Sequence, residues 1–113
     1  MKREQLEELG FVVKAELADE DIKDYLFVVE DHDGDIEVLH FYLNGLHLEP
    51  TVDIYFLNSF RKRERNKLRR DPQGFIENFN RYMVCNMPDA YVPVEAFIKN
   101  ARFLRKKGLT NFV

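Results

Sequence analysis

Apolar and polar residues alternate with a period of two through most of the first half of the chain, which is typical of half-buried β-strands. The first alternating run covers residues 11–17 and follows Gly10. Further runs of this kind are expected to form strands over residues 25–31, 35–43 and 46–49. Because short polar turns separate these runs, the pattern predicts an antiparallel β-meander of about four strands.

The dipeptides Asp33-Gly34 and Asn44-Gly45 are expected to form two-residue type I′ turns, which would set the register of the meander. The first turn then places Val28 opposite Leu39. Strict alternation of side chains puts one apolar set on a single face: Leu26, Val28, Leu39, Phe41, Leu43, Leu46 and Leu48. The opposite face is expected to be aromatic and mildly polar, with Tyr25, Phe27, Val29, Val38, His40, Tyr42, His47 and Glu49.

Helical spacing takes over outside these runs. Residues 2–9 fit a short helix that ends at Gly10. Residues 51–57 alternate like a strand but also fit a helical stripe, and we assign them to the sheet. A polar helix is expected from Asn58 or Ser59 to Arg70.

Two more helices are predicted nearer the end of the chain. Asp71-Pro72 is a typical helix start, with an N-cap residue followed by proline at the first helical position. The segment 87–92 is expected to be a loop, and the last helix runs over 93–107 and ends at Gly108. We therefore predict a single α+β domain over residues 1–113, in which two or three C-terminal helices pack on one face of the sheet.

Charge is divided unevenly along the chain. Residues 1–60 contain 15 Asp/Glu and 4 Lys/Arg, residues 61–113 contain 5 and 13, and the net charge is −3. Such a separation of positive from negative charge favours association with charged partners, including further copies of the chain. Cys85 is the single cysteine, and the charged start lacks the apolar core of a signal peptide. A cytoplasmic protein with no membrane segment and no disulfide is the expectation.

Seven of the ten residues from Arg61 to Arg70 are Lys or Arg. On a helix, a row of cations could follow a phosphate backbone, and a second basic ridge is expected on the helix 93–107. The alternative is a solvated helix whose cations meet the acidic first half of the same chain or of a neighbour. The candidate residues for nucleic-acid or partner binding are Arg61, Lys62, Arg65, Arg69, Lys99, Arg102 and Lys106.

Three aromatic residues of the predicted second sheet face, Tyr25, Phe27 and Tyr42, are candidate interface residues. Sheet aromatics can stack on single-stranded bases, but the acidic residues around them would repel phosphate. A covering protein partner, the C-terminal tail around Phe112 or the N-terminal helix is therefore the favoured explanation for this face.

Catalytic and metal-binding patterns are weak. The segment from Asp31 to Glu37 resembles a calcium loop only at its start, because Ile36 and Tyr42 stand where glycine and a carboxylate are required. The predicted register brings His40, His47 and Glu49 together, but hydrogen bonding to tyrosines is a simpler role for these residues. Cys85 lies beside an apolar helical stripe and is expected to be an inert, buried thiol. We predict no metal, no cofactor and no enzymatic activity.

The sequence therefore favours a non-enzymatic protein–protein interaction module that associates with itself. A small regulator or inhibitor of a larger protein, of the kind common among accessory proteins of phages and mobile elements, fits this description. The alternative is a nucleic-acid-binding protein that uses the basic helix 59–70 and the basic ridge of helix 93–107.

Overall fold

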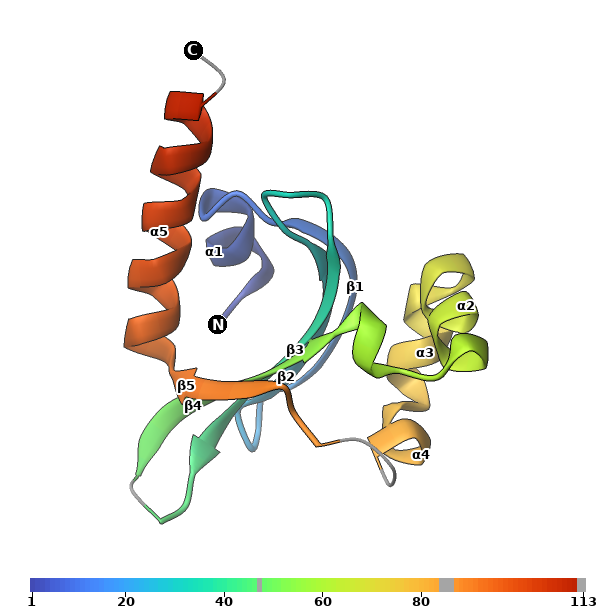
Figure 1. Ribbon diagram of the computed structural model, residues 1–113. Helices are drawn as coiled ribbons and strands as arrows, with labels where there is room; N and C mark the ends of the chain where they lie inside the picture. The colour runs from blue at the N-terminus through green and yellow to red at the C-terminus, as the bar shows by residue number, and fades with distance from the viewer. Residues whose placement is uncertain (47, 84–86, 112–113) are drawn as a thin grey trace.

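The computed structural model describes residues 1–46, 48–83 and 87–111, with side chains for all of these except 82–83 and 105–111. One sheet of five antiparallel strands in the order β1-β2-β3-β4-β5 forms its centre (Figure 1). The strands are β1 (Val12–Asp19), β2 (Asp24–Glu30), β3 (Ile36–Asn44), β4 (Glu49–Phe56) and β5 (Ala90–Pro93). The helices are α1 (Arg3–Glu8), α2 (Lys62–Arg70), α3 (Pro72–Glu77), α4 (Phe79–Met83) and α5 (Val94–Asn111). The predicted α+β class is confirmed.

The C-terminal helices lie on both faces of the sheet, which corrects the expectation that they share one face. Figure 1 shows α1 and α5 on the concave side of the curved sheet and α2–α4 on its convex side. The cause lies in β2, where Phe27, Val28 and Val29 are consecutive and at most 1% exposed. Because successive side chains of a strand point to opposite faces, such a run needs cover on both sides.

The hairpin between β2 and β3 contains one more loop residue than the sequence predicts. Val28 pairs with Val38 and not with Leu39. The Gly34 amide donates a hydrogen bond to the Asp31 carbonyl oxygen (3.0 Å), and Gly34 has a φ of 82°. The loop is therefore a type I turn followed by a left-handed glycine, not a type I′ turn. A shift of one residue moves every β3 side chain to the other face relative to β2.

The second hairpin is also longer than predicted. Asn44 pairs with Glu49, so the loop covers residues 45–48. Leu46 and Leu48 are 90% and 77% exposed and do not belong to an apolar face. The predicted strand 46–49 and the predicted strand 51–57 are replaced by the single strand β4, which confirms that residues 51–56 belong to the sheet.

The two faces of the sheet consequently differ from the predicted ones. Tyr25, Phe27, Leu39 and Phe41 face the concave core, together with Leu6 of α1 and Phe97 of α5. The convex core contains Val28 and Val38 of the sheet with Tyr55 and three aromatic residues beyond β4, which are Phe60, Phe75 and Phe79. The predicted single-face set is thus divided, since Leu26 and Val28 lie on the convex face and Leu39 and Phe41 on the concave face.

A bulge lets β1 contribute to both cores. Val13 pairs with Val29 and Ala15 pairs with Val28, so Lys14 is an extra residue in β1. Val13 consequently packs in the concave core and Ala15 in the convex core. The regular alternation seen in the sequence conceals this change of face.

Helix boundaries follow local capping groups. β4 leads into a 3₁₀ turn (Leu57–Ser59), and α2 begins at Lys62, so neither Asn58 nor Ser59 caps it. The Arg61 amide instead donates to Glu64 Oε1 at 2.8 Å. The predicted helix start at Asp71 is confirmed, because Asp71 Oδ1 accepts a hydrogen bond from the Gly74 amide at 3.0 Å.

The last helix differs from its prediction at both ends. Part of the predicted loop 87–92 and the predicted helix start Pro93 form the short strand β5, which pairs with β4. α5 therefore begins at Val94, and it continues through Gly108 to Asn111. A helical glycine is tolerated at a moderate energetic cost, so it does not by itself end a helix.

Candidate functional site

Half of the convex face has no helix over it. Strand register places five side chains in one row across this part of the sheet: Leu17, Leu26, His40, Asp53 and Tyr91. Two residues further along the strands, on the same face, lie Asp24, Tyr42 and Thr51. We call these eight residues the open half-face; within it, Thr51 is buried and Leu26 packs against the convex core. Tyr91 is 72% exposed and Leu17 is 43% exposed, whereas Tyr55 under the neighbouring helices is 1% exposed.

Two hydrogen-bonded pairs fix the polar groups of the open half-face. His40 Nε2 lies 2.9 Å from Asp24 Oδ1, and the Tyr42 hydroxyl donates to Asp53 Oδ1 at 2.9 Å. The rings of His40 and Tyr42 lie side by side, with centroids 4.9 Å apart. Burial raises the pKa of the Tyr42 hydroxyl to about 12, and its hydrogen bond to Asp53 adds to the shift. At neutral pH this hydroxyl therefore stays protonated and remains a donor.

Only one nitrogen of the His40 ring, Nε2, has a hydrogen-bond partner in this arrangement. Its Nδ1 atom is buried, and no hydrogen-bond partner for it exists among the residues that the structure describes. Glu49, the predicted neighbour of His40, is instead paired in register with Asn44. His40 is paired in register with Asp53. His47 is outside the described residues. The predicted grouping of His40, His47 and Glu49 is thus wrong for the His40–Glu49 pair, because the β3–β4 loop is longer than a two-residue turn.

An acidic rim borders the open half-face at the hairpin between β1 and β2. It consists of Asp19, Glu20, Asp21 and Asp24, which line a shallow hollow of about 470 Å³ with Leu17 and Ala18. Asp19 Oδ1 accepts a hydrogen bond from the Asp21 amide (3.1 Å), and Glu20 accepts one from the Tyr25 hydroxyl (2.9 Å). These bonds hold the rim in shape. Asp19, Glu20 and Asp21 stay exposed to solvent, whereas Asp24 is partly buried and paired with His40. The rim offers an anionic, concave surface to a cationic group.

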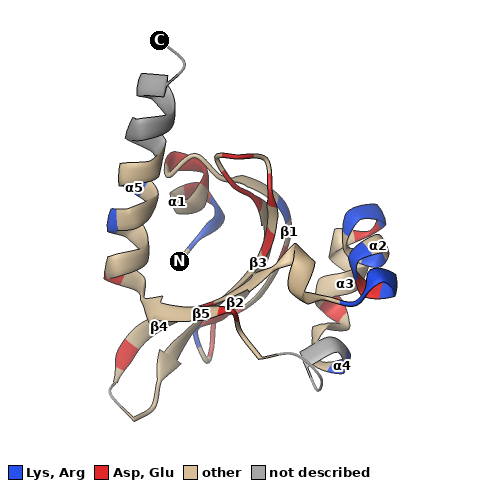
Figure 2. Cartoon of the chain, viewed as in Figure 1, with Lys and Arg blue, Asp and Glu red and all other residues tan. Residues whose placement is uncertain are grey.

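Residues 57–83 form a basic lobe on the other half of the convex face. Between residues 61 and 81 this lobe has eight Lys/Arg and three Asp/Glu, and Figure 2 shows the cations gathered on α2. Leu68 is the buried residue of α2 and directs the helix toward the core. The outer surface of the lobe is therefore strongly cationic.

Of the candidate cations at helical spacing, Arg61 and Arg69 are exposed, whereas Arg65 is drawn toward the lobe. Arg65 is partly buried, and its Nη1 donates to the Phe60 carbonyl oxygen at 2.6 Å. Lys67 pairs with Asp71 at 3.1 Å. Within the described part of the chain, no carboxylate pairs with the four exposed cations of α2, which are Lys62, Arg63, Arg69 and Arg70.

The second predicted basic ridge lies elsewhere. Lys99 and Arg102 are exposed on α5, which packs on the concave side, whereas α2 lies beyond the convex side (Figure 2). The Lys106 side chain is outside the described residues. The two ridges therefore do not form one continuous surface.

The three candidate aromatic residues are also separated. Phe27 is 1% exposed in the concave core, so it is not available to a partner. Tyr25 lies on the concave face, and only Tyr42 belongs to the open half-face. Sequence reasoning missed Tyr91, because the four residues of β5 are too few to display an alternating pattern. Cys85 lies outside the described residues, and its predicted burial stays a prediction.

The hairpin tip between β2 and β3 holds a second acidic group. Carboxylate oxygens of Asp31, Asp33 and Asp35 lie within 4.8 Å of one another. Asp31 Oδ1 already accepts hydrogen bonds from the amides of Asp33 and Asp35, both at 2.9 Å. Burial raises the pKa of the nearby Glu37 carboxyl to about 8, and a hydrogen bond with Asp31 adds to the shift. The Asp31 carboxylate thus shapes the turn.

Comparisons with protein-family models, with curated proteins and with solved structures gave no match. Among the helices of the described residues, none combines the length and the apolar character needed to cross a membrane. The chemistry of the open half-face, the acidic rim and the basic lobe is therefore the basis for a functional assignment.

Proposed function

We propose that this protein is a non-enzymatic protein–protein interaction module that docks through the open half-face. The proposal rests on one observation: Tyr91 and Leu17, two large side chains in the same row of the sheet, are exposed to solvent. An exposed tyrosine supplies a large apolar area with a polar tip, which suits a protein interface. The hydrogen-bonded pairs between these two residues, His40–Asp24 and Tyr42–Asp53, hold their side chains in place and so reduce the entropy lost on binding.

A role as a regulator or inhibitor of a larger protein follows from this proposal. A small module that contributes one surface acts by occupying a site on its partner, as phage and mobile-element accessory proteins do. Association of the module with itself belongs to the same proposal, since the charges of the two halves are complementary. The single cysteine suits a cytoplasmic location for it.

Affinity capture from the native host lysate tests the docking surface. The bait is the wild-type chain or a variant with Leu17→Ser and Tyr91→Ser, and each capture is repeated after nuclease treatment. We expect wild-type chain to retain a protein that survives nuclease and that the double variant loses. A matched control is Leu46→Ser with Phe103→Ser, which removes a leucine and an aromatic residue that are 90% and 62% exposed outside the open half-face.

The control variant should capture the same protein as the wild-type chain. Identical captures by the wild-type chain and by the Leu17→Ser/Tyr91→Ser variant would refute docking through the open half-face. Circular dichroism and thermal melting of all three baits establish that any loss reflects the surface and not the fold.

A second candidate function is nucleic-acid binding by the basic lobe. Its specific support is that Lys62, Arg63, Arg69 and Arg70 are exposed without an ion-pair partner among the described residues. Four phosphate contacts on duplex DNA predict that log K falls with log salt at a slope of about −3 to −4. Fluorescence anisotropy with single- and double-stranded oligonucleotides measures this slope.

The variant Lys62→Glu/Arg63→Glu/Arg69→Glu should abolish such binding. Lys99→Glu/Arg102→Glu, which changes charge on the concave side, should leave most of it. The absence of any anisotropy change at low salt would exclude this second function.

A further inference from the structure

The acidic rim and the basic lobe lie on the same side of the sheet. The rim belongs to the β1–β2 hairpin at the end of the open half-face, and the lobe covers the other half of that convex face (Figure 1). Opposite charges thus lie at two ends of one face of the chain. The groups that pair with these charges lie either within the same chain or on another molecule.

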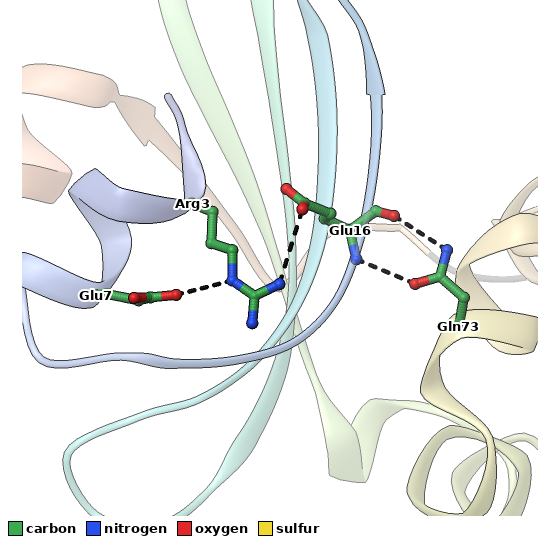
Figure 3. Close-up of polar contacts among 4 residues, drawn as sticks. All are labelled: Arg3, Glu7, Glu16 and Gln73. Atoms are coloured by element: carbon green, nitrogen blue, oxygen red, sulfur yellow. Dashed lines mark hydrogen bonds and ion pairs between the residues drawn. The ribbon is translucent and has the colours of Figure 1, made fainter.

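Within the chain, the lobe is attached to the sheet without ion pairs. Phe75 and Phe79 pack against Tyr55 and Val28 in the convex core. The polar attachment is a clamp by Gln73, whose Nε2 donates to the Glu16 carbonyl oxygen (3.0 Å) while its Oε1 accepts from the Glu16 amide (3.3 Å). Figure 3 shows this neutral clamp. For the residues described, no carboxylate of the sheet pairs with a cation of the lobe.

The charges on both patches therefore remain available to a second molecule. Asp19 and Asp21 of the rim are exposed beside a hollow that can admit a Lys or Arg head group, while Asp24 is paired with His40 and Glu20 accepts a hydrogen bond from Tyr25. Leu17 is exposed beside the rim and Tyr91 is exposed at the opposite edge of the same row, and a leucine side chain and a tyrosine face suit the stems and head groups of arginines. The lobe presents four such long cationic side chains, Lys62, Arg63, Arg69 and Arg70.

We propose that two copies of this chain form a closed two-fold dimer in which the basic lobe of each covers the acidic rim and open half-face of the other. Two complementary patches on one side of a molecule can be satisfied together by a two-fold axis. Patches on opposite sides would instead build open chains. This dimer rests on the proposed function, because it uses the same open half-face.

Multi-angle light scattering of the purified, nuclease-treated protein tests the dimer. We expect twice the chain mass of 13.5 kDa at low ionic strength, and a fall toward one chain mass at about 0.5 M salt as screening weakens the contacts. The lobe-reversed variant is Lys62→Glu/Arg63→Glu/Arg69→Glu, and the rim-reversed variant is Asp19→Lys/Glu20→Lys/Asp21→Lys. Each of these variants alone should be a monomer, because like charges then face each other.

An equimolar mixture of the two variants is the decisive measurement. Each contact in the mixed pair again joins opposite charges, so the mixture should recover twice the chain mass. This recovery also shows that both variants are folded. Lys99→Glu/Arg102→Glu, which changes net charge on the concave side, should remain a dimer.

Three results would overturn the proposal. They are a wild-type monomer at low salt, a mass that grows beyond two chains with concentration, and a mixture that stays monomeric. A monomeric wild-type chain would leave the lysate capture unaffected, and a failed capture would leave the measured mass unaffected. The dimer and the wider docking function are therefore tested separately.

Discussion

The concave and convex faces of the sheet are covered in different ways. On the concave face, α1 and α5 come from the two ends of the chain, and the core extends from Leu6 through Phe41 to Phe97. On the convex face, α2–α4 are inserted between β4 and β5 and cover one half only. The concave face is therefore packed into a core along its length, whereas the convex face is part core and part exposed surface.

The ends of the inserted lobe are held together by Asp89. Its carboxylate accepts hydrogen bonds from the Phe56 amide (2.7 Å) and from the Ser59 hydroxyl, at the point where the chain leaves β4. The lobe thus enters and leaves the sheet at one place. A short insertion anchored in this way reaches only part of the face, which accounts for the open half-face beside it.

The largest expected effect comes from removing one aromatic ring from each face. Phe27→Ala on the concave side and Phe75→Ala on the convex side should each lower the free energy of unfolding by about 3–5 kcal/mol, because both rings are fully buried. Urea denaturation followed by circular dichroism measures the change. Phe103→Ala, at a site 62% exposed, should change stability by less than about 0.5 kcal/mol.

Both core variants should unfold in a single transition, since the two cores share the strands β2 and β3. A biphasic curve for Phe75→Ala alone would mean that the lobe unfolds separately from the sheet. That result would contradict the view of the two faces as one cooperative unit.

A pH-dependent effect is expected on the concave side at Glu37. Because the folded-state pKa is raised from 4.5 to about 8, the folded state holds a proton that the unfolded state releases, and stability falls as pH rises from 4.5 through 8. Glu37→Gln removes this loss. At pH 8 and above the variant should be more stable by about 1–2 kcal/mol, after allowance for the partial exposure of the carboxyl.

Thermal melting of both proteins from pH 4 to pH 9 measures this difference. The two stability curves should converge below pH 4.5 and separate above it, with the wild-type chain the less stable. Parallel curves over the whole range would contradict the raised pKa of Glu37.

A smaller effect is expected at the start of α3 in the basic lobe. Asp71→Ala removes the N-cap hydrogen bond to the Gly74 amide and should cost about 1 kcal/mol. Gly74→Ala should also be destabilising, because its Cβ would lie 2.2 Å from Asp71 Oδ2. In the Asp71→Ala background the same change should be stabilising, since alanine favours helix over glycine by about 1 kcal/mol.

Urea denaturation of the four proteins in this double-mutant cycle measures the coupling between Asp71 and Gly74. Additive effects of the two substitutions would show that the cap does not determine the need for glycine at this position.

The smallest effect is expected from the clamp between the lobe and the edge strand β1. Gln73→Ala removes two exposed hydrogen bonds to Glu16 and should cost about 0.5 kcal/mol. Amide hydrogen exchange should become faster at Glu16, because its N–H then lies on an unprotected sheet edge. Arg3→Ala, which removes the 3.8 Å ion pair with the Glu16 side chain, should leave that amide unchanged (Figure 3).

Several elements could be predicted from local sequence because local forces create them. The capping pair Asp71-Pro72 starts a helix wherever it lies, and Gly10 with its φ of 98° ends the N-terminal helix. Alternation identified β1, β2, β3 and residues 51–56 of β4, but it missed β5 and treated residues 46–49 as a separate strand. In the candidate site, the cationic stretch was visible in the sequence, but Arg65 is held by the Phe60 carbonyl oxygen, which a spacing rule does not reveal.

By itself, the sequence determined the α+β class, the positions of the first three strands and the separation of acidic from basic halves, since all of these follow from local periodicity and composition. Only the tertiary structure decided which face each strand residue occupies. Asp33-Gly34 suits a two-residue loop and a three-residue loop alike, and the choice depends on long-range packing of residues such as Val28 against Val38. The open half-face and Tyr91 at its edge exist only because that register, together with the short strand β5, was selected.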